Sequence, residues 1–142
     1  MNSSCQIFKN FLGPQSINHL WKRTQVQKQT ILRPVDNSHL ATRCIQEMKK
    51  VRCIHVYRKR KYAFVGDLIL VTILGRMCKA IVVNTRQYST QGVPRADSNQ
   101  CVLVDKELKP LGNRISSPIP SVLRRFKQCE QLCSLPNITF VA

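Results

Sequence analysis

The stretch GDLILVTILGR, residues 66–76, decides the class of fold. Its aliphatic and β-branched run, Leu68–Leu74, lies between two turn sequences, Gly66-Asp67 and Gly75-Arg76. Such a run predicts a β-strand. Both alternating faces of the strand are apolar, so we expect its outer face to be covered as well, by other parts of the chain or by a partner.

Four further segments are short and rich in β-branched residues, and turn sequences such as Lys109-Pro110-Leu111-Gly112 separate them. Five strands at this spacing predict a mainly β fold, a small five-stranded β-barrel. The four further strands that we expect are Thr30–Val35, Val51–Tyr57, Lys79–Thr85 and Cys101–Val104.

The chain changes character after residue 117. Pro118 and Pro120 are incompatible with the interior of a strand, and Ser121 is a favourable helix cap. We therefore expect a C-terminal helix that Ser121 caps, that runs through Val122, Leu123 and Phe126 toward Leu132, and that ends before Pro136. The basic residues expected on one face of this segment are Arg124, Arg125 and Lys127.

The first 35 residues carry basic side chains but no acidic one, because Asp36 is the first carboxylate of the chain. Ile7, Phe8, Phe11 and Leu12 would form one apolar stripe on a helix. A basic, acid-free, amphipathic N-terminus predicts a mitochondrial transit segment over residues 1–28, disordered or cleaved, followed by one domain over residues 29–142. A basic arm that binds RNA is the alternative interpretation.

The whole chain is strongly basic: its 142 residues include 23 Lys and Arg against 7 Asp and Glu, a formal net charge of +16. This surplus indicates a polyanionic partner, either nucleic acid or an anionic membrane surface. No apolar run approaches the roughly 18 to 20 residues of a membrane span, so none is expected.

The densest basic run, Arg58–Lys61, lies between two predicted strands and is followed by Tyr62. A loop of this kind can reach phosphates while its charges stay in water, and a tyrosine can stack on a base; a solvated hairpin tip is the alternative. The residues that we expect to contact RNA are Lys49, Lys50, Arg52, Arg58, Lys59, Arg60, Lys61, Tyr62, Arg76, Lys79, Arg86, Arg95, Arg124 and Arg125.

No catalytic constellation assembles from the sequence. Asp36, Asp67 and Asp97 lie in turn contexts that Asx turns explain. Cys53 and His55, at positions i and i+2, are expected to share a strand face, but no third group would polarise them. We therefore expect neither an enzyme nor a cofactor.

The seven cysteines are odd in number and form no CxxC motif. Cys129 and Cys133 are four residues apart, but a tetrahedral metal site would need two more ligands from distant segments, and His39 is expected in a loop. Buried free thiols that pack as small apolar residues are therefore preferred over a zinc or disulfide framework, and no metal site is expected.

Six motifs occur in order along the chain, and together they resemble the universal large-subunit ribosomal protein L-fourteen family. These are Val35–Ser38 (VDNS), Arg52–Tyr57 (RCIHVY), Arg60–Asp67 (RKYAFVGD), Lys79–Val83 (KAIVV), Pro94–Asn99 (PRADSN) and Gly112–Ile115 (GNRI) followed by Pro118. A longer segment before Arg52 and a shorter turn at Gly75–Met77 than in bacterial members resemble the mitochondrial branch, which agrees with the leader.

The resemblance implies a barrel with a C-terminal helical region at the intersubunit face of the mitochondrial large ribosomal subunit. The implied partners are large-subunit rRNA, small-subunit rRNA through bridges, and ribosomal proteins L-three and L-nineteen. The resemblance also implies that a ribosome silencing factor docks at Asn113 and Arg114. An rRNA contact, or a bond to a neighbouring carbonyl, is the alternative role for Arg114.

A free nucleic-acid-binding module of the OB or cold-shock type is the alternative function. Such a module is expected to stack bases on aromatic side chains along a strand face. Tyr57 is the only aromatic residue in the predicted strands, so the sequence favours the ribosomal protein.

Overall fold

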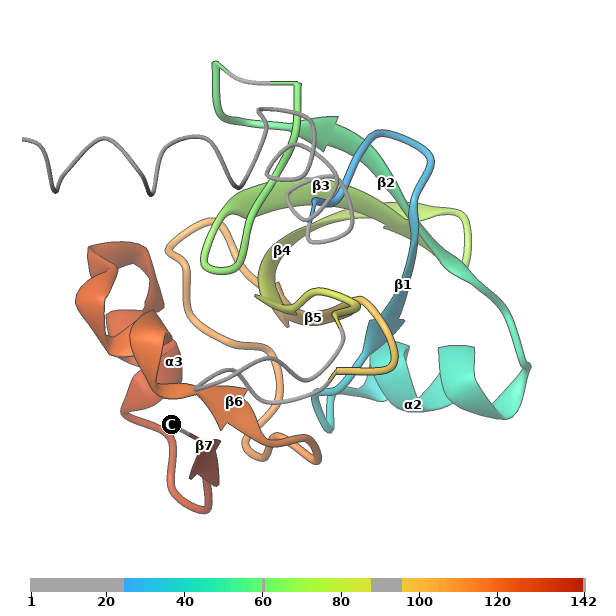
Figure 1. Cartoon of the computed structure of the whole chain (residues 1–142). Helices are drawn as coiled ribbons and strands as arrows, with labels where there is room; N and C mark the ends of the chain where they lie inside the picture. The colour runs from blue at the N-terminus through green and yellow to red at the C-terminus, as the bar shows by residue number, and fades with distance from the viewer. Residues whose placement is uncertain (1–24, 60, 88–95, 142) are drawn as a thin grey trace, which may run out of the picture.

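Five strands form a closed barrel in the computed structural model, which describes residues 25–59, 61–87 and 96–141. The strands are β1 (Ile31–Pro34), β2 (Val51–Val56), β3 (Leu68–Ile73), β4 (Arg76–Asn84) and β5 (Gln100–Val104). Each strand pairs antiparallel with the next, and β1 closes the barrel by pairing parallel with β5 (Figure 1). The predicted five-stranded barrel is confirmed.

Alternate residues of β3 fill the barrel interior: Ile69, Val71 and Ile73 are fully buried. The chain ahead of β1 contributes to the same core, because Val26 is fully buried and forms a bridge with Ala63. The barrel core therefore includes Val26, ahead of β1.

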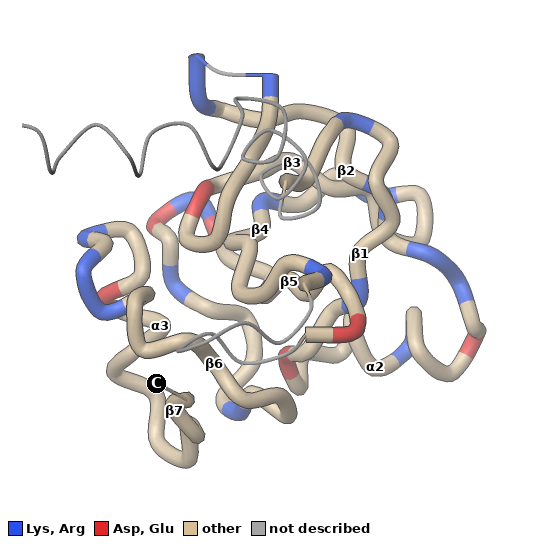
Figure 2. Tube along the Cα trace, viewed as in Figure 1, with Lys and Arg blue, Asp and Glu red and all other residues tan. Residues whose placement is uncertain are grey.

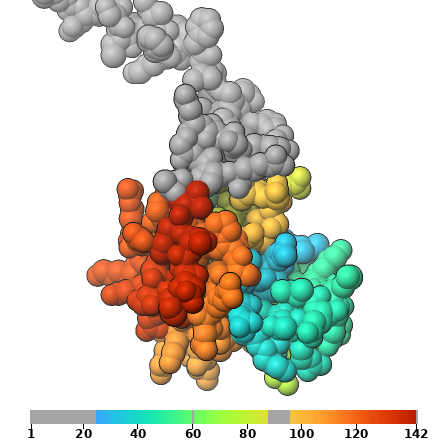
Figure 3. All heavy atoms as spheres, turned by 90° about the horizontal axis from the view of Figure 1, so that it is seen from below, coloured from blue at the N-terminus to red at the C-terminus, as the bar shows by residue number. Residues whose placement is uncertain are grey.

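The outer faces of β4 and β5 are also apolar and buried, through Ile81 and Val83 on β4 and Val102 and Val104 on β5. The C-terminal region covers them with the side chains of Ile115, Ile119, Leu123, Cys129 and Leu132. Figure 3 shows this region, in orange and red, as a continuous mass beside the blue and cyan N-terminal part. An outer cover thus exists on β4 and β5, whereas on β3, for which the sequence predicted it, only Leu68 packs against this cluster and Leu70 and Thr72 stay partly exposed.

The turn between β3 and β4 is a two-residue hairpin turn. Leu74 and Gly75 have φ angles of 49° and 78°, the left-handed conformation that such a turn requires. Because the turn is this tight, β4 begins at Arg76 rather than at the predicted Lys79. Tyr57 lies just after the end of β2, so β1–β5 contain no Phe, Tyr or Trp.

One helix was not expected from the sequence: α2 (His39–Gln46), in the segment before β2. Ser38 caps it, since the Ser38 hydroxyl accepts a hydrogen bond from the Ala41 N–H at 3.2 Å. Ala41 and Cys44 are buried in the barrel core, so α2 packs onto the barrel. His39 is the first residue of this helix, and its predicted position in a loop is wrong.

The C-terminal region is helical, as predicted, but it is not one helix. It consists of two 3₁₀ helices, η2 (Ser121–Arg125) and η3 (Lys127–Cys129), and the short helix α3 (Glu130–Cys133). Phe126 between them is extended, with φ −100° and ψ 119°, and the Ser121 side chain makes no capping bond. The prediction of a single helix capped by Ser121 is therefore wrong.

Two short strands, β6 (Ile119–Pro120) and β7 (Phe140–Val141), pair in parallel beside these helices. Pro120 is thus in a two-residue strand, where a missing N–H is tolerated. In the residues that the structure describes, no helix has the length and apolar character to cross a membrane.

Candidate nucleic-acid interface

Basic side chains of the described residues gather at separate places on the surface (Figure 2). One is the loop between β2 and β3, a second is the segment between α2 and β2, and a third lies over η2 and η3. All three are outside the strands, on chain segments that the barrel holds in place.

Arg58 in the β2–β3 loop is held by the protein itself. Its Nη1 lies 2.7 Å and 3.0 Å from the two carboxylate oxygens of Asp67, whose side chain is 6 % exposed. Asp67 also accepts a hydrogen bond from the Phe64 N–H at 2.9 Å. Asp67 therefore holds both ends of the loop, a wider role than the local Asx turn that the sequence suggested. Because Arg58 pairs with Asp67, its charge is already neutralised within the chain.

The neighbouring Lys59 and Lys61 are exposed and make no ion pair within the described residues. Tyr62 is 40 % exposed, and Tyr57 at the other end of the loop packs edge-on against the His55 ring at 5.6 Å between centroids. Arg60 lies outside the described residues. The loop thus offers two free cations and two accessible rings.

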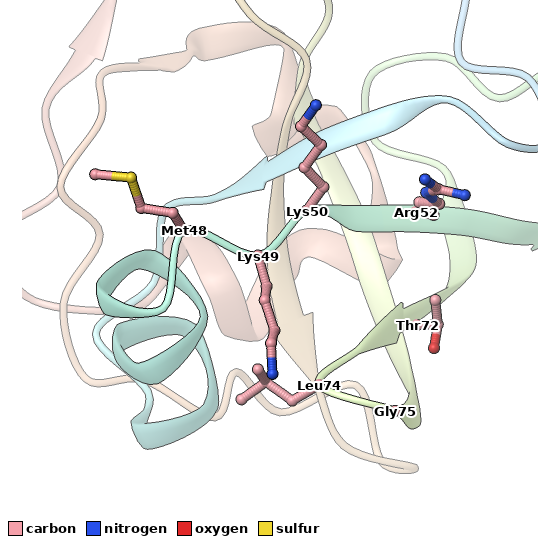
Figure 4. A pocket seen from close by; sticks show the side chains of 7 residues that line it. All are labelled: Met48, Lys49, Lys50, Arg52, Thr72, Leu74 and Gly75. Carbon is pink, nitrogen blue, oxygen red and sulfur yellow. The ribbon is translucent and has the colours of Figure 1, made fainter.

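The predicted residues Lys49, Lys50 and Arg52 line one open hollow of about 490 Å³, which we call the Met48 groove. Arg52 on β2 pairs with Thr72 on β3, and this register brings the β3–β4 turn beside the segment after α2. Figure 4 shows Met48 at one end of the groove and Arg52 and Thr72 at the other, with the Lys49 ammonium directed toward Leu74. The complete lining is Met48, Lys49, Lys50, Arg52, Thr72, Leu74 and Gly75.

Glu47 partly neutralises one side of the Met48 groove. Its carboxylate lies 2.8 Å from Lys49 Nζ and 3.1 Å from Arg43 Nη2. Hydrogen bonds from Lys49 and then Arg43 hold the pKa of Glu47 below its usual value. Lys50 and Arg52 have no ion-pair partner in the described part of the chain, so their charges remain available to a ligand.

Arg76 lies in a second hollow, of about 280 Å³, on the other side of Leu74. Two basic residues of α2, His39 and Arg43, line the same hollow and were not expected as site residues. The missed signal was local: Ser38 precedes a helix whose buried positions, Ala41 and Cys44, are three residues apart.

The remaining predicted RNA contacts are dispersed. Lys79 is half-buried on β4, and Arg86 is exposed with its backbone N–H donating to Asn99 Oδ1 at 2.8 Å. Arg124 lies over the Phe140 ring at 4.0 Å, whereas Arg125 is exposed. Arg95 is outside the described residues. None of Lys79, Arg86, Arg124 and Arg125 lines the Met48 groove.

Asn113 and Arg114 are exposed on a backbone that is paired to the end of β1. The Arg114 carbonyl accepts from the Asn37 N–H at 3.0 Å, and the Ser116 N–H donates to the Val35 carbonyl at 3.0 Å. Arg114 lines a cavity of about 320 Å³ that also includes Asp36, Asn37, Thr42, Ile45, Gln46 and Ser116. This edge is therefore both accessible and fixed in position.

Asp36 at the base of that cavity is buried. Its Oδ1 accepts from the Leu103 N–H at 3.4 Å, and its Oδ2 has no hydrogen-bond partner among the described residues. Burial raises the pKa of Asp36 above its usual value, against the lowering effect of the Ser38 side chain and the Leu103 N–H. Asp36 thus links the end of β1 to β5, a wider role than the Asx turn predicted for it.

The sequence pair Cys53 and His55 does not form a site. A β-bulge shifts the register between them, so Cys53 is buried whereas His55 is exposed, and the expected shared face is wrong. Burial raises the pKa of Cys129 to about 12 and that of Cys101 further still. The described cysteines are free thiols, most of them buried, and no metal-binding cluster of His, Cys, Asp or Glu occurs in residues 25–59, 61–87 and 96–141.

Comparisons with known proteins agree with the motifs. Residues 25–139 match the family described as Ribosomal protein L14p/L23e. The chain is also similar to a Danio rerio protein named "Large ribosomal subunit protein uL14m", at 40 % identity over 102 residues, which cover 72 % of this chain and 71 % of that protein. The family indicated by the sequence motifs is thereby confirmed. With its meander barrel and its six motifs in register, the chain belongs to the ribosomal protein L14p/L23e family.

Proposed function

We propose that this protein is a structural constituent of the mitochondrial large ribosomal subunit and that it binds rRNA through basic side chains at the margins of its barrel. The observation that carries the proposal is a set of exposed cations that form no ion pair within the described part of the chain: Lys50, Arg52, Lys59 and Lys61. Side chains of this kind neutralise phosphates and fix register, and a rigid barrel keeps them in place. Similarity to a protein named as a mitochondrial large-subunit protein supports the location.

The alternative, a free module of the OB type, has less support. An OB-fold is a Greek-key barrel, whereas here each strand pairs with the next in sequence order. Strands β1–β5 also lack the aromatic side chains on which such modules stack bases. We retain the OB type only as the outcome to expect if the protein is found free of ribosomes.

Salt dependence of RNA binding tests the proposed role of the β2–β3 loop. The double variant Lys59→Ala/Lys61→Ala should weaken binding of the full chain to large-subunit rRNA and lessen the log–log salt slope by about 2 units if each lysine contacts one phosphate. Lys106→Ala, an exposed cation outside the proposed surfaces, is the matched control and should leave the slope unchanged. An unaltered slope in the double variant would make the loop a solvated hairpin tip.

We further propose that the edge at Asn113 and Arg114 docks a ribosome silencing factor. The support is the fixed backbone, the adjoining cavity and the half-exposed apolar side chain of Ile45, which lines the same cavity as Arg114. A guanidinium at such an edge can form a charge-assisted, bidentate bond to a carboxylate of the partner. Contacts with ribosomal proteins L-three and L-nineteen and bridges to small-subunit rRNA belong to the same proposal.

Binding of the silencing factor to large subunits that carry Arg114→Ala tests the docking proposal. Arg114→Ala should weaken the binding free energy of the silencing factor by about 2 to 5 kcal/mol if the ion pair is buried in the interface. This loss, together with normal subunit assembly, would support the docking proposal. Retained binding with defective assembly would instead assign Arg114 to rRNA. Lys106→Ala again provides the control for a general effect of lost charge.

The transit segment remains a proposal, and the structure sharpens where it should end. Val26 is fully buried, and its backbone exchanges hydrogen bonds of 2.9 Å and 2.8 Å with Ala63. Cleavage at residue 28 would remove this core residue, so we propose cleavage before Gln25. N-terminal sequencing of the ribosome-bound protein tests this: a start before residue 26 but after Met1 is expected, and either intact Met1 or a start beyond Val26 would contradict it.

A further inference from the structure

Met48 is the most exposed large apolar residue that the structure describes, with 90 % of its surface accessible. It follows the last turn of α2, and its φ angle is 51°, in the left-handed region. Its backbone ends the helix: the Met48 N–H donates to the Ile45 carbonyl at 3.1 Å, and the Lys49 N–H donates to the Cys44 carbonyl at 3.0 Å. This is the Schellman arrangement, in which the left-handed position is usually a glycine.

The folded chain does not account for a methionine at this position. A side chain with a Cβ is strained in the left-handed region, and Met48 buries almost none of its surface in return. Glycine would end the helix without that strain. The thioether is therefore better explained by contact with something outside the chain.

The surroundings of Met48 indicate what that contact is. Met48 lies at one end of the Met48 groove, with Lys50 and Arg52 following on its side of the groove and Leu74 and Gly75 across from them (Figure 4). Lys50 and Arg52 form no ion pair with any residue that the structure describes. Apolar surface beside free cations matches the two parts of a nucleotide, a base with apolar faces and an anionic phosphate. A methionine sulfur also makes favourable contacts with aromatic rings, and its three rotatable bonds let it adapt to them.

We propose that the Met48 groove holds one unpaired nucleotide of an RNA, with its phosphates on Lys50 and Arg52 and its base against Met48 and Leu74. A continuous duplex would present only phosphates and sugars here and would leave the apolar end of the groove unused, whereas a bulged or looped-out nucleotide presents a base face. The proposal rests on the proposed rRNA binding, and it adds the conformation of the RNA that is recognised.

The test measures binding of the full chain to two RNA hairpins that differ by one bulged adenosine. The unaltered protein should bind the bulged hairpin about fivefold more tightly, the low end of what one base contact contributes. Met48→Ala should lose this preference and keep its affinity for the paired hairpin, because it retains the backbone conformation and removes only the thioether. Met77→Ala, which truncates a second methionine that is 71 % exposed outside the groove, should retain the preference.

The outcomes separate this proposal from rRNA binding in general. Equal affinity of the unaltered protein for both hairpins, or an unchanged preference in Met48→Ala, would overturn the nucleotide site and leave rRNA binding intact. Failure to bind either hairpin would contradict the proposed function as well.

A second measurement uses the assembled ribosome. A photoreactive methionine analogue at position 48 should crosslink to an rRNA nucleotide in purified large subunits. A crosslink to a neighbouring protein instead would show that the groove docks an acidic or apolar polypeptide, and would overturn the proposal.

Discussion

The β2–β3 loop and the Met48 groove are both basic, but they use their charges differently. In the loop, Arg58 forms an ion pair with the buried Asp67, so part of the positive charge stabilises the fold. In the groove, Glu47 pairs with Lys49 and Arg43 at the surface, and Lys50 and Arg52 have no ion-pair partner among residues 25–59, 61–87 and 96–141. The comparison teaches that a run of basic residues cannot be counted directly as an RNA-binding surface, because a buried carboxylate such as Asp67 already pairs with part of it.

Two glycines, one in each region, provide the largest expected difference. A Cβ at Gly66, where φ is 89°, would lie 2.7 Å from the Phe126 ring, whereas a Cβ at Gly75, where φ is 78°, would meet nothing within 4 Å. Gly66→Ala should lower the free energy of unfolding by about 3 kcal/mol through strain and overpacking, and Gly75→Ala by only about 1 kcal/mol through strain. Urea denaturation of both variants measures this; equal losses would show that the Phe126 contact is unimportant.

Arg58→Ala should have the next largest effect. It leaves the Asp67 carboxylate buried without its cation, but Arg58 is 50 % exposed, so we expect a loss of about 1 to 2 kcal/mol rather than the full cost of breaking a buried pair. Lys59→Ala, one residue away, should change stability by less than about 0.5 kcal/mol. If thermal denaturation gave the same stability for both variants, the distinction between structural and free charges in the loop would fail.

The smallest expected effect has the opposite sign. Met48→Gly should raise the free energy of unfolding by about 0.5 to 1 kcal/mol, because glycine adopts the left-handed conformation at the end of α2 without strain. The same variant should bind the bulged hairpin less well. A destabilised Met48→Gly would mean that the thioether stabilises the folded chain, which would remove the main reason to assign it to a ligand.

The barrel could be predicted because β-branched runs such as Leu68–Ile73 lie between turn residues in the sequence itself. The position of the outer cover could not, since it lies over β4 and β5 and reaches β3 only at Leu68. The helix α2 was missed because its local signal is weak: Ser38 is a favourable cap, but only Ala41 and Cys44 of its eight residues are buried, and the helix depends on packing against the barrel. The β-bulge between Cys53 and His55 likewise arises from pairing with β3, so the spacing of these two residues in the sequence could not predict it.

The candidate site was predicted less completely than the fold. The cations of the Met48 groove were found from charge alone, but their arrangement around Met48 depends on the register of β2 with β3 and on the tight β3–β4 turn. The Arg58–Asp67 pair joins residues on either side of the loop, so no short motif indicated it. The sequence predicted which basic residues are candidates for RNA contact, and the tertiary structure shows which of them already pair with a carboxylate of the chain.

Sedimentation of the tagged full-length protein from a mitochondrial lysate on a sucrose gradient tests the central claim most directly. We expect the protein to comigrate with the large ribosomal subunit and to leave those fractions when the rRNA is digested with ribonuclease. A protein found only in the free fractions at the top of the gradient would contradict a structural role in the subunit and would favour a free RNA-binding module.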